Sequence, residues 1–458
     1  APPATAPPAA GVAPAAAGAS QQPAAGTEAK VGRMPKDLRR GRWEEAGACA
    51  ALCQLILDDR HCSGQPRRRP PLPPQLWAEM VAPFLRFDEL MPDMLYAFGG
   101  RNQTQGPLST TEMFDTWHGR WVLCEPMPTR RAGSAAALLP DGRMIVVGGY
   151  NEKGIAEGLL DTCDVFDPSR QCWVEGGAPP LRRARWGHGC AVLRGRAYAV
   201  GGCSLQADAR PREAFMETLK SCEVLDLERG QWFPCAPLQI ARSGARLVAL
   251  QGDRYLAAAG GCDDVFGRAE TQPTVELFDV VAGTWSLLES QLVNPRTTAA
   301  VASVGRHSLL VFGGAPSLTS AEVYRVQLPS ERAEASREEA EEGAREVPAL
   351  RRALEPGVVS DMKDGRMGCQ AALLRLPGRG GRFPLADTLC AVVVGGERCE
   401  DSGEGPRVRQ FATTSVYDVA ARAWREDEAV PPLSAPRTAA ALCVGPGRGC
   451  SLLEPASP

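Results

Sequence analysis

The sequence predicts an all-β fold, a β-propeller of six blades. A short apolar run that ends in a glycine doublet occurs six times between residues 92 and 446. Four of the five spacings between successive doublets are 49, 53, 59 and 53 residues, and the last is 82. A repeat of this length is typical of chains built from stacked supersecondary units. The doublets are Gly99-Gly100, Gly148-Gly149, Gly201-Gly202, Gly260-Gly261, Gly313-Gly314 and Gly395-Gly396.

A tryptophan and an aspartate mark the second half of the repeat. In five of the six units an alternating run ends in an aromatic or aliphatic residue plus Asp, as in Phe114-Asp115. A tryptophan follows, 22 to 31 residues after the doublet, and the fifth unit, which has Tyr324, lacks it. The tryptophans are Trp121, Trp173, Trp232, Trp285 and Trp424.

An arginine opens the strand that follows each tryptophan, 10 to 13 residues further on, and Arg366 keeps that place beyond the long interval. The arginines are Arg131, Arg185, Arg242, Arg296, Arg366 and Arg437. Each unit therefore predicts four short strands: one after the arginine, one into the doublet, one into the Asp and one through the tryptophan.

Taken together, these landmarks resemble the kelch repeat over about three quarters of the chain. The resemblance implies a six-bladed kelch β-propeller, in which four-stranded sheets bury their faces against neighbouring blades. Glycine permits the positive φ of the tight turn and close approach of blade backbones. A tryptophan buried between blades removes about 150–250 Å² from water, worth at most about 4–6 kcal/mol.

The two ends of the repeat region complement each other. The first unit has a doublet strand at residues 94–98 but no arginine-led strand before it, whereas residues 437–444 form such a strand with no doublet after it. We therefore expect the two ends to share one blade.

Four segments are expected along the chain. Residues 1–42, rich in Ala and Pro, predict a disordered tail. Residues 43–91 predict a short helical segment. Within it, residues 72–85 resemble the opening helix of an F-box and would be a partial remnant of that domain. The alternative is an amphipathic helix packed on the propeller. The propeller takes residues 92–446, with a charged insertion at about 329–360 that is rich in Glu, Arg and Ala, and residues 447–458 form a C-terminal tail.

Composition narrows the function classes. The net charge of −3 argues against a nucleic-acid partner, and the apolar runs fall short of the roughly 18 residues that span a membrane. Most of the sixteen cysteines lie in predicted strands and none forms a C-x-x-C pair, which favours reduced thiols in the cytoplasm or nucleus. For Cys49, Cys53 and His61 or Cys62 we favour the apolar side of a short helix over metal ligands, and we expect no metal.

Catalysis is not expected. Some kelch-type propellers are copper oxidases, which need His, Tyr and Cys ligands at the axis. This chain has four histidines, His61, His118, His188 and His307, and no two occupy equivalent repeat positions. The doublets also lack a phosphate-binding motif. We expect no enzyme activity and no cofactor, and a propeller oxidase remains a remote alternative.

The resemblance implies a protein-interaction module. In kelch substrate adaptors of cullin ubiquitin ligases, arginines at matching positions bind acidic peptide motifs, and guanidinium suits carboxylate pairing. We expect the six arginines to form a solvent-accessible ring at one mouth of the channel, with two or three of them free to bind a ligand. Trp186 would serve as an aromatic anchor beside them. The alternative is that each arginine bonds its own blade. Substrate recognition for a cullin-type ligase is the favoured context, and a scaffold or cytoskeletal (actin-type) binding protein is the alternative.

Overall fold

The computed structural model describes residues 93–445, apart from 117, 207–215, 251–253, 264–270, 306, 328–348, 353–359, 378–386, 402–404 and 427–429. The tail, the helical segment and the C-terminal tail expected at 1–42, 43–91 and 447–458 lie outside the described residues. Most of the charged insertion does so as well.

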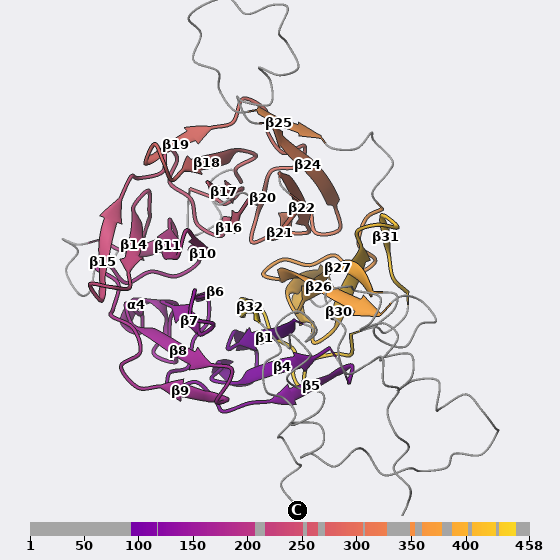
Figure 1. Ribbon diagram of the computed structural model, residues 1–458. Helices are drawn as coiled ribbons and strands as arrows, with labels where there is room; N and C mark the ends of the chain where they lie inside the picture. The colour runs from indigo at the N-terminus through magenta and orange to yellow at the C-terminus, as the bar shows by residue number, and fades with distance from the viewer. Residues whose placement is uncertain are drawn as a thin grey trace, which may run out of the picture. The chain divides into compact units, whose positions relative to one another are not determined.

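Six four-stranded antiparallel sheets are arranged around one axis, which confirms the all-β, six-bladed propeller (Figure 1). Blade 1 contains β32 (Ala441–Gly445), β1 (Met94–Phe98), β4 (Thr111–Asp115) and β5 (Arg120–Leu123). Blade 2 contains β6 (Ala135–Leu138), β7 (Met144–Val147), β8 (Cys163–Asp167) and β9 (Cys172–Val174). Blade 3 contains β10 (Gly189–Leu193), β11 (Arg196–Val200), β14 (Cys222–Asp226) and β15 (Gln231–Cys235).

The remaining three blades follow the same order of strands. Blade 4 contains β16 (Arg246–Ala249), β17 (Tyr255–Ala259), β18 (Val275–Asp279) and β19 (Thr284–Leu287). Blade 5 contains β21 (Ala300–Val304), β22 (Ser308–Phe312), β24 (Ala321–Gln327) and β25 (Ala349–Arg352). Blade 6 contains β26 (Gln370–Pro377), β27 (Asp387–Val394), β30 (Thr414–Asp418) and β31 (Ala423–Trp424).

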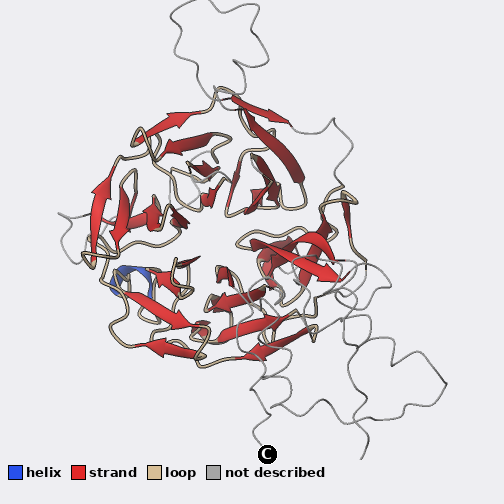
Figure 2. Ribbon diagram, viewed as in Figure 1, coloured by secondary structure: helices blue, strands red, loops and turns tan. Residues whose placement is uncertain are grey.

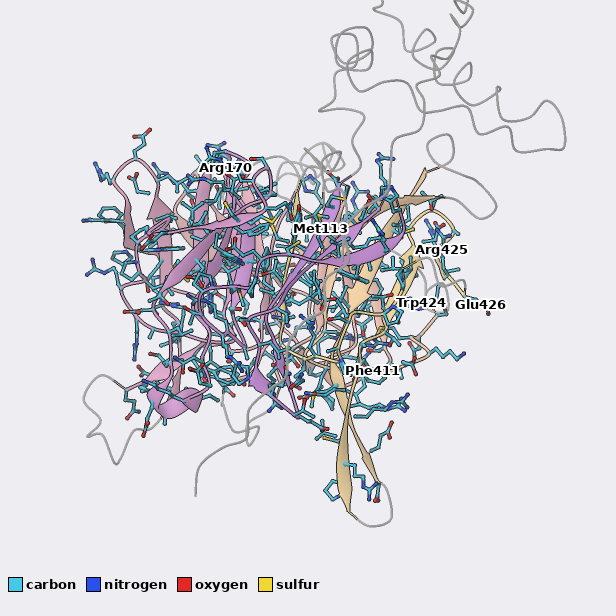
Figure 3. The ribbon with its side chains drawn as sticks, turned by 90° about the horizontal axis from the view of Figure 1, so that it is seen from below. Met113, Arg170, Phe411, Trp424, Arg425 and Glu426 are labelled. Atoms are coloured by element: carbon cyan, nitrogen blue, oxygen red, sulfur yellow. The ribbon has the colours of Figure 1, made fainter. Side chains whose placement is uncertain are left out.

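Small two-stranded sheets and one short helix lie at the doublet ends of the blades. They are β2 (Arg101–Asn102) with β3 (Gly106–Pro107), β12 (Cys203–Leu205) with β13 (Met216–Thr218), β20 (Arg296–Thr297) with β23 (Ala315–Pro316), and β28 (Glu397–Asp401) with β29 (Pro406–Gln410). The helix is α4 (Gly154–Glu157), drawn blue in Figure 2. We call this side of the propeller the hairpin face. The β28–β29 hairpin extends furthest from it, as Figure 3 shows beyond Phe411.

Blade 1 closes the propeller with strands from both ends of the repeat region, as the sequence predicted. β1 pairs antiparallel with β32, in a register that sets Phe98 opposite Ala441. Arg437, just before β32, also forms an ion pair with Glu112 on β4. The ring is therefore joined by a complete strand ladder and by a buried charge pair.

The hydrophobic core is divided among the blade interfaces. Six clusters of buried side chains each combine residues of two neighbouring blades; one joins Leu225 of blade 3 to Val147 of blade 2. Each tryptophan indole Nε1 donates to a carbonyl oxygen in the loop that precedes its own blade, as Trp232 does to Pro179 at 3.1 Å. Trp232 and Trp285 are buried, whereas Trp121, Trp173 and Trp424 are only half-buried.

Tyr324 takes over part of this bridging in blade 5, where the tryptophan is missing. Its hydroxyl oxygen accepts a hydrogen bond from the backbone nitrogen of Val293, in the loop before the blade, at 2.7 Å. The blade thus keeps a polar link to its neighbour.

The doublets require glycine for two reasons. Gly99 and Gly100 both have positive φ, at 56° and 90°. A Cβ atom on Gly99 would lie 2.4 Å from the carbonyl oxygen of Arg131, closer than any real contact. Neighbouring blades therefore meet backbone to backbone at this point.

Candidate functional site

The six repeat arginines are buried inside the blades. Their exposed fraction is 0 or 1% in every case. Each guanidinium donates to the carbonyl oxygen of the first glycine of its own doublet, as Arg242 does to Gly260 at 2.7 Å. The carbonyl oxygen of each arginine in turn accepts from the second glycine of the preceding blade, as Arg131 does from Gly100 at 2.9 Å. Each arginine therefore joins two blades.

A carboxylate on the third strand neutralises five of these arginines. The nitrogen–oxygen distances are 2.8 Å for Arg131–Asp164, 2.6 Å for Arg185–Glu223, 2.6 Å for Arg242–Glu276 and 2.5 Å for Arg296–Glu322, and Arg437 pairs with Glu112. Burial lowers the pKa of Arg242, and Glu276 opposes that shift. A charge removed from water needs such a partner, because an unpaired buried ion costs several kcal/mol.

The expectation of a solvent-accessible arginine ring is therefore wrong. Arg131, Arg185, Arg242, Arg296, Arg366 and Arg437 sit at equivalent positions, as predicted, but none reaches solvent. The alternative, that each arginine bonds its own blade, matches the contacts. Their role in this structure is to hold the blades together.

A closed circle of backbone hydrogen bonds surrounds the axis beside the arginines. It is formed by the residue two positions after each arginine, whose nitrogen donates to the carbonyl oxygen of its counterpart in the preceding blade. The bonds run Gly187 to Gly133, Gly244 to Gly187, Thr298 to Gly244, Gly368 to Thr298, Ala439 to Gly368 and Gly133 to Ala439, at 2.8–3.0 Å. Thr298 and Ala439 adopt φ of 53° to take part, a conformation usually left to glycine. This circle fixes the mouth of the channel.

Trp186 lies at this mouth, between Arg185 and the circle. Its ring is half-buried and packs edge-on against Tyr150 of the preceding blade, with centroids 5.8 Å apart and planes at 85°. Its indole Nε1 is buried without a hydrogen-bond partner among the described residues. Of the predicted contact residues, Trp186 is the one that keeps exposed surface.

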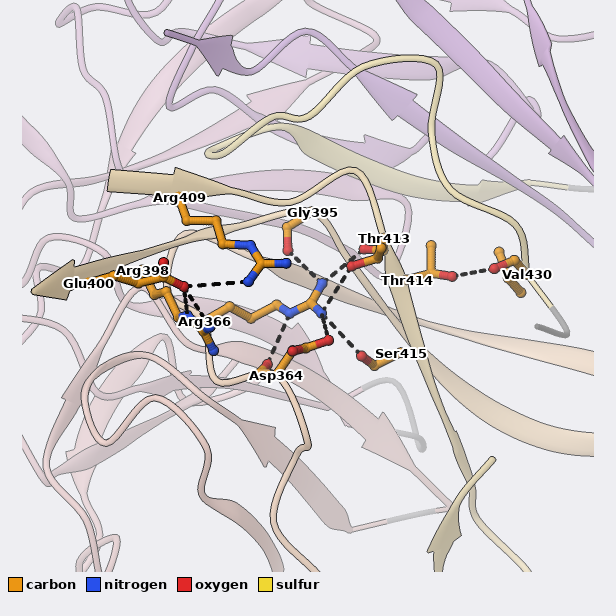
Figure 4. A network of polar contacts seen from close by, with 10 residues as sticks. All are labelled: Asp364, Arg366, Gly395, Arg398, Glu400, Arg409, Thr413, Thr414, Ser415 and Val430. Atoms are coloured by element: carbon orange, nitrogen blue, oxygen red, sulfur yellow. Dashed lines mark hydrogen bonds and ion pairs between the residues drawn. The ribbon is translucent and has the colours of Figure 1, made fainter. Parts of the chain in front are cut away.

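Blade 6 departs from the charge pattern of the other five. Ser415 on β30 occupies the position of the missing carboxylate, and its Oγ lies 3.3 Å from Nη2 of Arg366 (Figure 4). The carboxylate that pairs with Arg366 is Asp364, at 3.9 Å on a side chain that is 43% exposed. Arg366 is thus a buried cation with weak compensation.

Two more arginines gather beside Arg366 around one aromatic ring. Arg398 on β28 and Arg409 on β29 lie with Arg366 over Phe411, with guanidinium carbons 5.6, 5.3 and 4.4 Å from the ring centroid. The side chains of Arg398 and Arg409 are 28% and 56% exposed. We call Arg366, Arg398 and Arg409 the blade 6 arginine cluster.

The cluster carries more positive than negative charge. Arg398 donates to Glu400 at 2.6 Å, and Arg409 does so at 3.5 Å (Figure 4). The bond from Arg398 holds the pKa of Glu400 below its usual range. Burial lowers the pKa of Arg366, and Arg398 and Arg409 lower it further while Asp364 opposes them. Among the residues that the structure describes, three guanidinium groups therefore share two carboxylates, Asp364 and Glu400.

Blade 1 holds the β28–β29 hairpin in place. Gln103, after β2, donates from Nε2 to the carbonyl oxygen of Val408 at 2.6 Å and from its backbone nitrogen to Oε1 of Gln410 at 3.0 Å. Arg101 forms an ion pair with Glu397 at 3.3 Å. The cluster thus stands on a hairpin that two blades position.

The residues that the sequence did not single out are Ser415, Arg398, Arg409 and Phe411. A signal for Ser415 was present, because the second residue of the third strand is acidic in five units and serine in the sixth. Those acidic residues are Glu112, Asp164, Glu223, Glu276 and Glu322. Nothing periodic marks Arg398 and Arg409, since they lie on an extension that belongs to one blade.

The described histidines do not gather at the axis. His118 Nδ1 bonds Asp115 at 2.5 Å in a turn of blade 1, and His188 is buried at the start of blade 3. No group of three His, Cys, Asp or Glu side chains in the described part of the chain is arranged to hold a metal ion. Among those same residues no helix has the length and apolar character needed to cross a bilayer.

Comparison with known proteins places the repeat in a family. A family model described as "KLHDC2/KLHL20/DRC7 Kelch-repeats domain" matches residues 89–314. Alpha-scruin of Limulus polyphemus is 30% identical over 166 residues, which cover 36% of this chain and 17% of alpha-scruin. Kelch-like protein 36 of Mus musculus is 27% identical over 203 residues, which cover 42% of this chain and 29% of the relative. A solved structure titled "Structure of YjhT" aligns with a TM-score of 0.49 and 12% identity over 69% of this chain and 88% of that chain.

The matched segments span less than a third of the length of these two curated relatives. The match to the family model ends at residue 314, and the blades beyond that residue continue the same order of arginine, doublet and third strand up to the closing strand β32. The chain is therefore a kelch-repeat β-propeller protein.

Proposed function

We propose that this propeller is a protein-recognition module that recruits a substrate protein to a cullin-type ubiquitin ligase. The substrate would present an acidic segment to the hairpin face, and the blade 6 arginine cluster would bind it. One observation carries the proposal: Arg366 is buried without the in-blade carboxylate that its five counterparts have, next to two arginines that reach solvent.

A carboxylate from a partner protein is a suitable ligand for this cluster. Guanidinium groups bind carboxylates with two parallel hydrogen bonds, and Arg398 and Arg409 offer exposed donors for them. Few negative charges inside the blade offset that of Arg366. Its positive charge therefore strengthens the attraction of an anion at the surface. Such binding weakens as salt rises, because surface charges are screened.

Trp186 is proposed as an aromatic anchor of the same interface. It lies at the channel mouth on the side of blades 2 and 3, where the edge-on contact with Tyr150 fixes its ring. Rigid, half-exposed aromatic side chains often supply much of the binding energy at protein interfaces. Replacement of Trp186 by alanine should then weaken binding of the partner without unfolding the propeller.

The alternative is a scaffold or cytoskeletal (actin-type) binding protein with no ligase. Affinity purification of the full-length protein from cytoplasmic and nuclear extracts separates the two, because a ligase adaptor captures a cullin. Capture of cytoskeletal proteins with no cullin would contradict the ligase assignment.

The same purification tests the site if it includes the double variant Arg398→Glu/Arg409→Glu. We expect this variant to lose substrate proteins that the parent captures. Arg254→Glu is the matched control, because Arg254 is 50% exposed and ion-paired with Asp279 at 2.7 Å, at the opposite end of the blades from the hairpin face. Equal losses in the control and the double variant would contradict a site at blade 6.

A further inference from the structure

We propose that Cys222 and Cys235 form an oxidation site, at which an oxidant of the peroxide class converts the two thiols to a disulfide within blade 3. The proposal concerns a different blade from the arginine cluster and does not depend on the partner proposed above.

The strand register brings the two thiols together. Cys222 on β14 lies directly opposite Cys235 on β15. The Cα atoms of directly opposite residues in an antiparallel pair are about 4.5–5.5 Å apart, within the range of about 4.4–6.8 Å that disulfides span. Both side chains pack in the same hydrophobic cluster, between blades 3 and 4. The register therefore places the two thiols where a disulfide can form.

This arrangement distinguishes the pair from the other cysteines that the structure describes. All twelve described cysteines, this pair included, are free thiols. The others on paired strands face different residue types, such as Val408 opposite Cys399 and Thr218 opposite Cys203. Within the described ladders, Cys222 and Cys235 are the cysteines that face each other.

The surroundings of Cys222 favour the reactive thiolate. A hydrogen bond from Cys235 and the positive charge of Arg185 lower the pKa of Cys222, although burial opposes them. The same thiol–thiol bond raises the pKa of Cys235, which acts as the donor. Cys235 is only half-buried on β15, the outermost strand of the blade, so a small oxidant has a short path to the pair.

The chemistry is a two-electron oxidation. Hydrogen peroxide oxidises one sulfur to a sulfenic acid as its O–O bond breaks, and one water leaves. The second thiol attacks that sulfur, the S–S bond forms, and a second water leaves with the remaining oxygen. In total two thiols and one peroxide give one disulfide and two waters.

The disulfide would fasten the outer strand of blade 3. It closes a loop of about 14 residues, and cross-links of that size restrict the unfolded chain appreciably. Cys222 directly precedes Glu223, whose carboxylate forms an ion pair with Arg185 at 2.6 Å. The strand that the disulfide would hold therefore carries a contact to the residue next to Trp186. We expect the melting temperature to rise by about 3–6 °C on oxidation.

Peptide mapping of the full chain tests the site. The protein is treated with hydrogen peroxide, remaining thiols are alkylated without reduction, and the sample is digested with trypsin. Cleavage after Lys220, Arg229 and Arg242 places the two cysteines on separate peptides, 221–229 and 230–242. The expected product is these two peptides joined, with the mass of two hydrogens lost, together with the rise in melting temperature.

Two variants serve as controls. Cys235→Ser should abolish both the joined peptide and the rise in melting temperature. Cys399→Ser should change neither, because Cys399 is exposed on the β28–β29 hairpin and faces Val408. Recovery of 221–229 and 230–242 as separate alkylated peptides, under conditions that oxidise Cys399 in the parent, would overturn the proposal.

Discussion

Nη2 of Arg366 lies 3.3 Å from Oγ of Ser415, at the place where the other five blades set a carboxylate against the repeat arginine. The register confirms the equivalence. Ser415 pairs with Val393, one residue before the end of the doublet strand β27, as Glu276 pairs with Ala258 in β17. A single substitution within the repeat therefore leaves one of six buried arginines without a carboxylate on the third strand.

The variant Ser415→Glu should stabilise the propeller. Its carboxylate would reach Arg366 as Glu276 reaches Arg242, and a hydrogen-bonded charge pair of this kind contributes about 1–3 kcal/mol. Urea unfolding of parent and variant measures the difference in free energy of unfolding. A variant that is less stable than the parent would contradict the expectation that a carboxylate at this position stabilises blade 6.

Replacement of Arg242 by alanine should destabilise the fold rather than remove a partner. The substitution leaves Glu276 buried and unpaired and removes the bond to Gly260, at a cost of about 3–5 kcal/mol. Trp186→Ala is the comparison, because removal of a half-buried side chain at the channel mouth should lower the stability less. The melting temperatures of the two variants distinguish these effects. An Arg242→Ala protein with the melting temperature of the parent would contradict a structural role for Arg242.

Removal of residues 434–458 should open the ring. The truncation deletes β32 and Arg437, so that β1 becomes an unpaired edge strand in an exposed sheet. Size-exclusion chromatography should show aggregates. A shorter truncation, of residues 447–458, retains β32 and should remain monodisperse; aggregation of both truncations alike would leave closure by β32 unsupported.

Stability should decline in acid because of His188. This side chain is buried, its ring nitrogens have no partner among the described residues, and burial, assisted by Arg185 and Arg246, lowers its pKa to about 3. The unfolded chain takes up a proton near pH 6.5, well before the folded protein does, so the free energy of unfolding falls by up to about 1.4 kcal/mol per pH unit below that value.

The variant His188→Leu isolates this contribution. Between pH 7.5 and pH 5 it should lose about 2 kcal/mol less stability than the parent, because it has no proton to take up at this site. Denaturant unfolding at the two pH values measures the difference. Identical losses in parent and variant would mean that His188 titrates normally in the folded protein.

The fold could be predicted because its determinants recur locally. The doublets and the arginines recur in all six units and the Asp–Trp pairs in five, each within a short stretch, and the shared blade follows from the two incomplete ends. The short link from Tyr324 to Val293 could not be foreseen, because it depends on how two blades meet.

The site could be predicted only in part. The positions of the arginines were correct, but their burial depends on carboxylates on another strand of the blade. These lie 26 to 38 residues away along the chain in four blades and 325 residues away in blade 1. The placement of the β28–β29 hairpin depends on Gln103, which lies 305 and 307 residues from its partners Val408 and Gln410. The acidic residue of the third strand recurs in the sequence, but nothing periodic marks the contacts of Gln103.

Binding of a fluorescently labelled glutamate-rich peptide, followed by anisotropy at low salt, tests the central claim most directly. The parent should bind the peptide, and binding should weaken as salt is added. Ser415→Glu and Arg409→Glu should each bind at least about tenfold more weakly, a loss of about 1.4 kcal/mol, while Arg254→Glu binds as the parent does. Equal affinity in the parent and in Ser415→Glu, or no binding by the parent, would contradict an acidic-segment site at the blade 6 arginine cluster.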